Sequence, residues 1–162
     1  TLVRLRMPRA LEALDDTLRG LEQGTMTTLE AIDCLLTEEL TFREGRRIGV
    51  ALTTARLTPT KTLESFEFSF QPSLDREQIM ALAQLDFVDR AEVVHLLGPP
   101  GTGKSHLATA LGVAAVKAGK SVYRCSLAEL IDGLSKAERE GCLIEKIRFY
   151  ARASLLFIDE IG

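Results

Sequence analysis

One short stretch constrains this chain more than any other: Gly98-Pro99-Pro100-Gly101-Thr102-Gly103-Lys104-Ser105. It fits the pattern G-x-x-x-x-G-K-[ST], a loop that holds the phosphates of a bound nucleotide. Glycines let the backbone turn tightly enough for successive N–H groups to point at one phosphate group. Lys104 is expected to reach the outer phosphates, and the hydroxyl of Ser105 is expected to be a ligand of Mg²⁺. We call residues 98–105 the phosphate loop.

The residues on either side of the phosphate loop have the pattern that such a site requires. The mostly apolar stretch Ala91–Leu97 predicts a strand that runs directly into the loop. After Ser105, apolar residues recur at helical spacing, and Gly119 predicts the C-cap of that helix. The positive end of the helix adds to the attraction for phosphate. The order of strand, loop and helix predicts an α/β nucleotide-binding domain.

A second half of the candidate site comes at the other end of the chain. Leu155–Ile158 is a short apolar run, which predicts a strand buried on both faces of a parallel sheet. It places Asp159 and Glu160 at its carboxyl end, where ligands bind in open α/β sheets. We expect Asp159 to hold Mg²⁺, usually through the metal's waters, and Glu160 to orient and deprotonate the attacking water. This pair favours ATP hydrolysis over a small-molecule kinase, which usually lacks the adjacent glutamate.

Composition narrows the class of protein. The 162 residues carry a net charge of −3, which excludes a broadly basic nucleic-acid binder but not a local basic face. The sequence contains no apolar run of membrane-spanning length and no signal-peptide pattern, so we expect no membrane partner. Three cysteines without metal-ligand spacing fit a reduced, cytoplasmic setting.

The pattern of apolar and polar residues divides the chain into three parts. Residues 1–58 predict a helical N-terminal domain, 59–74 an extended Phe-rich linker, and 75–162 the N-terminal part of an ATP-binding domain. In the first part, Pro8 suits a first helical turn and Gly24 ends that helix. Thr27 and Glu30 predict a capping box for the next helix, in which Gly45 is either a break or only a weak point.

Arg43, Arg46 and Arg47 form a basic cluster within a segment that is close to neutral. Such a cluster is either a solvated helix face or a contact for DNA or an acidic partner, and the sequence does not separate the two.

The linker contains Ser65–Phe70, a strict alternation of polar residues and phenylalanines. It predicts an extended segment or edge strand with one apolar side. We call residues 59–74 the strap. The strap either packs on the next domain or lines the pocket for the nucleotide base.

The remaining elements alternate between helix and strand. The spacing predicts a helix over Asp75–Val88, a strand over Ser121–Cys125 and a helix built on Leu143–Tyr150. Ser126 and Glu129 predict a second capping box, which opens the helix that follows the second strand.

These motifs together resemble a known family. The phosphate loop with its continuation His106-Leu107-Ala108, the helix that begins after Ser126 and the closing stretch Leu155–Gly162 are similar to the IstB group of AAA+ ATPases. Those proteins are transposition helpers of bacterial insertion sequences, related to the DnaC helicase loaders. The helical front and the strap also resemble IstB proteins, so the likeness covers nearly all of the chain. Ser105 stands where the family often has threonine, and Glu160 where it often has aspartate; both keep the functional group.

The resemblance implies a larger protein than this chain. AAA+ sheets have the spatial order 5-1-4-3-2, so a strand is expected between Ala91–Leu97 and Leu155–Ile158. The family's ATPase domain also continues past this point, with a sensor residue and an arginine that acts on a neighbouring subunit's ATP. We therefore expect the chain to be a fragment that hydrolyses ATP poorly on its own, while weak nucleotide binding by the phosphate loop survives.

The resemblance also implies a function. We expect an ATP-dependent helper of DNA transposition that assembles on DNA as a homo-oligomer and engages a transposase through its helical front. His106 joins the phosphate loop among the residues expected to contact ATP. One alternative is a loader of a replicative helicase, with the same nucleotide chemistry and a different partner. The other is a nucleotide-binding interaction module that never turns ATP over.

Overall fold

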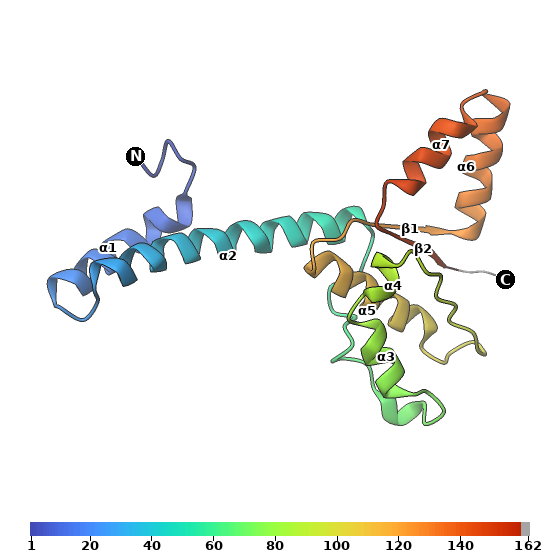
Figure 1. Ribbon diagram of the computed structural model, residues 1–162, viewed down its shortest axis with the longest axis horizontal. Coiled ribbons are helices and arrows are strands. Elements are labelled where there is room, and N and C mark those ends of the chain that lie inside the picture. The colour runs from blue at the N-terminus through green and yellow to red at the C-terminus, as the bar shows by residue number, and fades with distance from the viewer. Residues whose placement is uncertain (160–162) are drawn as a thin grey trace. The chain divides into compact units, whose positions relative to one another are not determined.

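The computed structural model describes residues 1–159 and is mostly helical, with a small parallel sheet of two strands (Figure 1). The chain forms two compact units, Thr1–Gly49 and Val50–Gly162. Among the described residues, no helix is both long enough and apolar enough to cross a membrane.

The first unit contains α1 (Pro8–Glu22) and most of α2 (Thr28–Thr54). As predicted, Pro8 lies in the first turn of α1, and the chain leaves that helix through Gly24 with a φ of 69°. The capping box is confirmed, because Thr27 Oγ1 accepts from the N–H of Glu30 at 3.3 Å while the Glu30 carboxylate accepts from the N–H of Thr27 at 2.7 Å. Gly45 does not break α2, which continues through it.

A buried carboxylate is held in this first unit. Glu39 is only 3% exposed, and its two oxygens accept from the backbone N–H of Arg9 at 3.1 Å and from Nε of Arg43 at 2.7 Å. Arg43 also donates to the carbonyl of Arg6 at 2.8 Å. Because a buried charge is costly unless it is paired and hydrogen-bonded, Arg43 has a structural task inside this unit.

The second unit begins with the end of α2, which closes in a Schellman motif. The N–H of Leu57 donates to the carbonyl of Leu52 at 2.9 Å, and the N–H of Arg56 donates to that of Thr53 at 3.1 Å. Arg56 takes the left-handed position of the motif, with a φ of 53°, where glycine is usual. Leu52 and Leu57, whose positions usually carry the apolar pair of this motif, are both buried.

From the phosphate loop onward, the helices and strands follow the order that the sequence predicts. The phosphate loop leads into α5 (Lys104–Lys117), and the described residues after it form β1 (Val122–Ser126), α6 (Leu127–Arg139), α7 (Leu143–Ala151) and β2 (Leu155–Asp159). The predicted capping box of Ser126 and Glu129 opens α6. β1 and β2 pair in parallel, with Val122 opposite Leu155 and Ser126 opposite Asp159.

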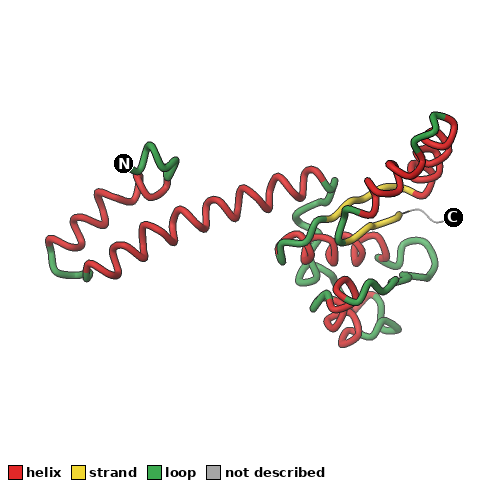
Figure 2. The backbone as a smooth tube through the Cα atoms, turned by 45° about the horizontal axis from the view of Figure 1, so that its top comes forward, coloured by secondary structure: helices red, strands yellow, loops and turns green. Residues whose placement is uncertain are grey.

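One predicted strand is absent. Ala91–Leu97 lies in the connection between α4 and α5 and has no strand assignment (Figure 2). The stretch is apolar enough for a strand, but a strand exists only where another backbone pairs with it, and the described sheet contains β1 and β2 alone. For the same reason β2 is half-buried along its length, and the prediction that it is covered on both faces is wrong.

The prediction of one continuous helix over Asp75–Val88 is also wrong. It is divided into α3 (Arg76–Leu82) and α4 (Asp86–Asp89), because Leu85 takes a left-handed conformation with a φ of 67°. The turn directs Leu85 into a buried cluster with Phe87 and Ala115 of α5. Tertiary packing here prevails over helical periodicity.

The strap is not an extended strand. It contains a 3-10 turn, η1 (Phe68–Phe70), and Ser65 Oγ lies 2.9 Å from the carbonyl oxygen of Thr62 in a further turn before η1. Phe66 and Phe68 pack on the buried cluster that includes Leu107 of α5, whereas Phe70 is 80% exposed. The strap therefore packs on the part of the chain that carries the phosphate loop, and the strict alternation fails because turns direct the third phenylalanine outward.

Phe66 also touches the phosphate loop. Gly103 has a φ of 85°, and a Cβ placed on it would lie 2.6 Å from Cε2 of Phe66. Gly101 has a similar φ of 80°, yet a Cβ there would meet nothing within 4 Å. Both positions need a left-handed backbone, but only Gly103 also needs the absence of a side chain for packing.

This difference predicts how alanine acts at the two glycines. Gly101→Ala should cost about 1–2 kcal/mol of stability from the left-handed backbone alone, and Gly103→Ala should cost more because its methyl group would also meet the Phe66 ring. Urea unfolding followed by circular dichroism would measure both, each alone and combined with Phe66→Ala. We expect Phe66→Ala to relieve part of the Gly103→Ala effect and none of the Gly101→Ala effect. Additive losses in both pairs would contradict the contact.

Candidate functional site

The phosphate loop lies at the N-terminal end of α5, so that Lys104 and Ser105 are the first two residues of the helix. Lys104 Nζ donates to the carbonyls of Gly98 and Pro99, both at 2.7 Å. Thr102 Oγ1 donates to the same carbonyl of Pro99 at 2.9 Å. The ammonium therefore rests on acceptors of its own loop. Phosphate oxygens bound there would compete for its donors, since charged acceptors make the stronger hydrogen bonds.

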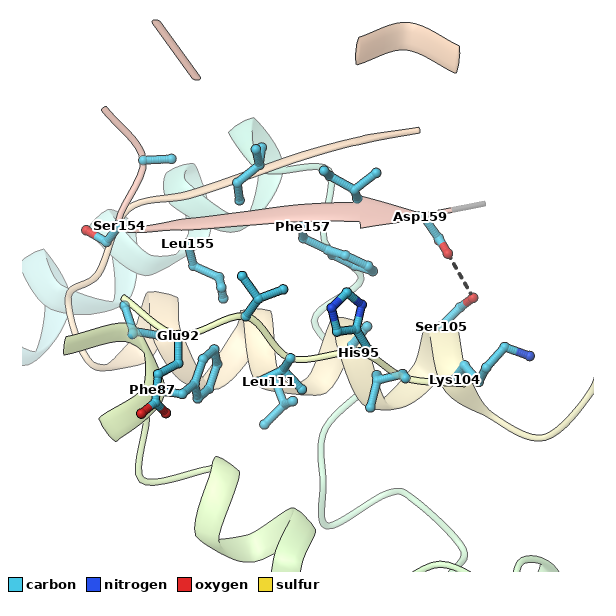
Figure 3. A pocket seen from close by; sticks show the side chains of 18 of the residues that line it. Phe87, Glu92, His95, Lys104, Ser105, Leu111, Ser154, Leu155, Phe157 and Asp159 are labelled. Atoms are coloured by element: carbon cyan, nitrogen blue, oxygen red, sulfur yellow. Dashed lines mark hydrogen bonds between the residues drawn. The ribbon is translucent and has the colours of Figure 1, made fainter. Parts of the chain in front are cut away.

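The two predicted metal ligands come together in the structure. Ser105 Oγ donates to Asp159 Oδ1 at 3.2 Å, joining the start of α5 to the end of β2 (Figure 3). Both residues are brought there by main-chain elements, the helix that follows the phosphate loop and the strand paired with β1. Glu160, predicted to activate water, lies outside the described residues. The roles predicted for all these side chains remain predictions.

The oxygen atoms at this point suit Mg²⁺. Within residues 1–159, no cluster of three or more histidine, cysteine, aspartate or glutamate side chains could hold a metal by itself. Mg²⁺ does not need such a cage, because it is usually bound through one or two protein oxygens together with substrate phosphates and waters. A hydroxyl from Ser105 and a carboxylate from Asp159, beside a phosphate loop, are that kind of donor set.

Arg124 is a residue that sequence reasoning missed. Its Nη2 donates to Asp159 Oδ2 at 2.8 Å, and its Nη1 donates to the carbonyl of Arg56 at 3.2 Å. The guanidinium also lies over the ring of Phe157, 5.2 Å from its centroid. The parallel register places Arg124 opposite Phe157, two residues before Asp159 on the same face of β2. The signal was available only once β1 and β2 were known to be neighbours.

His106 faces the strap in this structure. Its Nε2 lies 3.1 Å from the carbonyl oxygen of Thr62 and 3.3 Å from Oγ of Ser65. The imidazole also meets the Phe66 ring edge to face, with 5.3 Å between centroids. The predicted contact of His106 with ATP stays a prediction, and what the structure adds is a connection between the strap and the first turn of α5.

An open groove extends from the site. It has a volume of about 950 Å³ and runs between the connection that holds residues 91–98 and strand β2, with Lys104, Ser105 and Asp159 at one end. Leu155 and Phe157 of β2 line one side, and Leu111 of α5 lies across from them (Figure 3). Most of the groove is therefore apolar, and its polar groups gather where the phosphate loop meets β2.

Comparison with known proteins places these features in a family. The family described as IstB-like ATP binding protein matches residues 1–162, which is the whole chain. A Pseudomonas aeruginosa protein, named for ATP binding and for insertion sequence IS21, is 42% identical over 161 residues, covering 99% of this chain and 61% of the relative. A Geobacillus stearothermophilus protein, named in the same way for insertion sequence IS5376, is 33% identical over 159 residues, covering 98% of this chain and 63% of the relative.

A relative from Bacteroides fragilis strain YCH46 is 31% identical over 157 residues, covering 97% of this chain and 79% of its own length. Its name also refers to ATP binding and to an IS21-like insertion sequence. The chain thus spans 61% and 63% of the lengths of the first two relatives. With a family match over every residue and a phosphate loop that meets an aspartate at a strand end, the chain belongs to the IstB-like ATP-binding proteins of insertion sequences.

Proposed function

We propose that the protein binds ATP with Mg²⁺ at the phosphate loop and hydrolyses it. The observation that carries the proposal is the hydrogen bond between Ser105 Oγ and Asp159 Oδ1, 3.2 Å long. It brings a hydroxyl of the phosphate loop and the carboxylate at the end of β2 to one point, although 54 positions separate them in the sequence. These two oxygens would hold a Mg²⁺ ion that binds together with the phosphates of the nucleotide.

The residues of the site have separate tasks in this proposal. When ATP binds, the ammonium of Lys104 exchanges the carbonyls of Gly98 and Pro99 for oxygens of the outer phosphates. It does so because charged phosphate oxygens accept stronger hydrogen bonds than carbonyl oxygens. Ser105 and Asp159 would hold Mg²⁺, which would supply positive charge next to the phosphoryl group that is transferred. Glu160, next along the chain, orients the attacking water and takes its proton.

We further propose that the complete domain has the AAA+ sheet order. In that order an additional parallel strand lies between Ala91–Leu97 and β2, where the structure has a mostly apolar groove. Two features support this arrangement: Ala91–Leu97 is apolar yet has no strand partner among the described residues, and β2 has a described partner only in β1. A strand there would form backbone hydrogen bonds with Ala91–Leu97 on one side and with β2 on the other, as the backbone groups of strands require.

The cellular role that we propose is help in DNA transposition. The relatives are named for insertion sequences, which are mobile DNA elements. In this role the protein assembles on DNA as a homo-oligomer and engages a transposase. A transposase gene beside the protein's own gene would support this role, whereas a replication gene in that place would support the loading of a replicative helicase.

Three substitutions test the division of tasks at the site. Lys104→Ala should abolish binding of a fluorescent ATP analogue by removing the charge that meets the outer phosphates. Glu160→Gln should retain ATP and Mg²⁺ and stop turnover, whereas Asp159→Asn should weaken Mg²⁺ binding. Titrations with and without Mg²⁺, together with phosphate release by the protein on DNA, would measure these effects.

Lys117→Ala is the matched control for Lys104, because Lys117 is exposed at the far end of the same helix. It should leave nucleotide binding unchanged. Unaltered affinity in Lys104→Ala would show that the nucleotide binds elsewhere. Equal loss of ATP binding in Glu160→Gln and Asp159→Asn would remove the division between metal ligand and base.

The DNA part of the proposal concerns Arg46 and Arg47, which are exposed on α2. Arg43 is left out because it holds the buried Glu39. Reversing Arg46 and Arg47 together to glutamate should weaken DNA binding and lower the slope of log affinity against log salt by about 2, at roughly 0.9 per phosphate contact. The same double reversal at Arg139 and Arg148, on α6 and α7, is the control. If both pairs of reversals changed the slope of log affinity against log salt equally, Arg46 and Arg47 would belong to a solvated helix face and not to a specific DNA contact.

A further inference from the structure

We propose that Arg124 is the positioning residue for the carboxylate of Asp159, which it fixes between the end of α2 and the phosphate loop. This inference rests on the function proposed above, because it assigns Asp159 a metal to hold. It concerns a residue outside the phosphate loop and outside the acidic pair at the end of β2.

The two oxygens of Asp159 have different partners. Oδ1 accepts from Ser105 Oγ at 3.2 Å, and Oδ2 accepts from Arg124 Nη2 at 2.8 Å. The side chains of Arg124 and Asp159 are 31% and 21% exposed, so this ion pair is partly shielded from water. With Oδ2 held by the guanidinium, the carboxylate cannot turn freely, and Oδ1 stays directed at the side where Ser105 lies. A metal beside Ser105 can then meet Oδ1, directly or through a water, without displacing Arg124.

Arg124 is itself held at three points. Its Nη1 donates to the carbonyl of Arg56 at 3.2 Å, its Nη2 donates to Asp159, and its planar group lies over the Phe157 ring. Only a planar fork of donors can serve a carbonyl and a carboxylate at once while stacking on an aromatic face. Lysine has the same charge but offers a single compact ammonium, so it cannot hold both partners in this geometry.

The carbonyl that receives Arg124 belongs to an unusual residue. Arg56 is left-handed, with a φ of 53°, at the C′ position of α2, where most chains place glycine. Its side chain pairs with Glu129 at 3.1 Å while its carbonyl binds Arg124. The cap of α2, strand β1 and the carboxylate at the end of β2 are therefore joined through one guanidinium. The pocket lined by Arg56, Arg124, Ser126, Glu129 and Asp159 is the space around this junction.

A substitution that keeps the positive charge at position 124 separates the effect of orienting Asp159 from the effect of the charge on metal binding. Removing a cation near a metal site strengthens metal binding by relieving repulsion, whereas losing the orientation of a ligand weakens it, typically by about 10–100-fold. Arg124→Lys retains the charge and loses the fork, so its effect reports orientation alone. Arg148→Lys, the same change at an exposed position on α7, is the matched control.

The experiment measures a fluorescent, non-hydrolysable ATP analogue bound to the protein, first in EDTA and then across a Mg²⁺ titration. For Arg124→Lys we expect unchanged affinity in EDTA and a Mg²⁺ half-saturation at least about tenfold higher than in the wild type. Arg148→Lys should match the wild type in both conditions. If Arg124→Lys failed to fold, as judged by circular dichroism, Phe157→Leu would be measured by the same criterion, because it keeps the Arg124 charge and removes the ring on which the guanidinium lies; a higher half-saturation is again the expected result.

Two results would overturn the proposal. A Mg²⁺ half-saturation in Arg124→Lys within twofold of the wild type would show that the fork does not position Asp159. A lower half-saturation would show that Arg124 competes with the metal instead. Failure of the proposed function looks different, since the wild type would then bind the analogue equally with and without Mg²⁺, or not at all.

Discussion

The parallel pairing of β1 with β2 is the constraint on which the rest of the site depends. The register puts Ser126 opposite Asp159, so the end of β2 lies level with the start of α6. α5 brings Ser105 to the same level, and its hydroxyl reaches the Asp159 carboxylate at 3.2 Å. If β2 slipped by one residue, Asp159 would turn to the other face of the sheet and lose both Ser105 and Arg124. The phosphate loop and the end of β2, which are distant in the sequence, therefore form one site only because β1 and β2 pair in this register.

The phosphate loop is supported from a second direction by the strap. Phe66 lies against Gly103, and His106 binds the strap through Thr62 and Ser65. Phe66 and Phe68 also cover the apolar cluster under α5. The strap and β2 therefore approach the first turn of α5 from separate parts of the chain. The loop is therefore held by the packing of Phe66 on Gly103 as well as by hydrogen bonds within the loop, such as that from Lys104 to the carbonyl of Gly98.

Local chemistry made much of this predictable from the sequence. The phosphate loop, the capping boxes at Thr27 and Ser126, and the strand that ends in Asp159 are each encoded by adjacent residues. The predictions failed where the conformation is determined by contacts between residues that are distant in the sequence. Leu85 turns left-handed to reach the core, and Ala91–Leu97 lacks a partner strand among the described residues. Arg124 could not be found at all, because its role depends on the register of two strands rather than on any motif.

The central claim is that Ser105 and Asp159 serve one metal–nucleotide site, and a double-mutant cycle tests it most directly. Binding of a non-hydrolysable ATP analogue would be measured for Ser105→Ala, Asp159→Asn and the double variant, in Mg²⁺ and in EDTA. If both residues hold the same metal, their effects should be non-additive in Mg²⁺ by about 0.5–3 kcal/mol and additive in EDTA. Additive effects in both conditions would mean that the two side chains act separately, and would contradict the account.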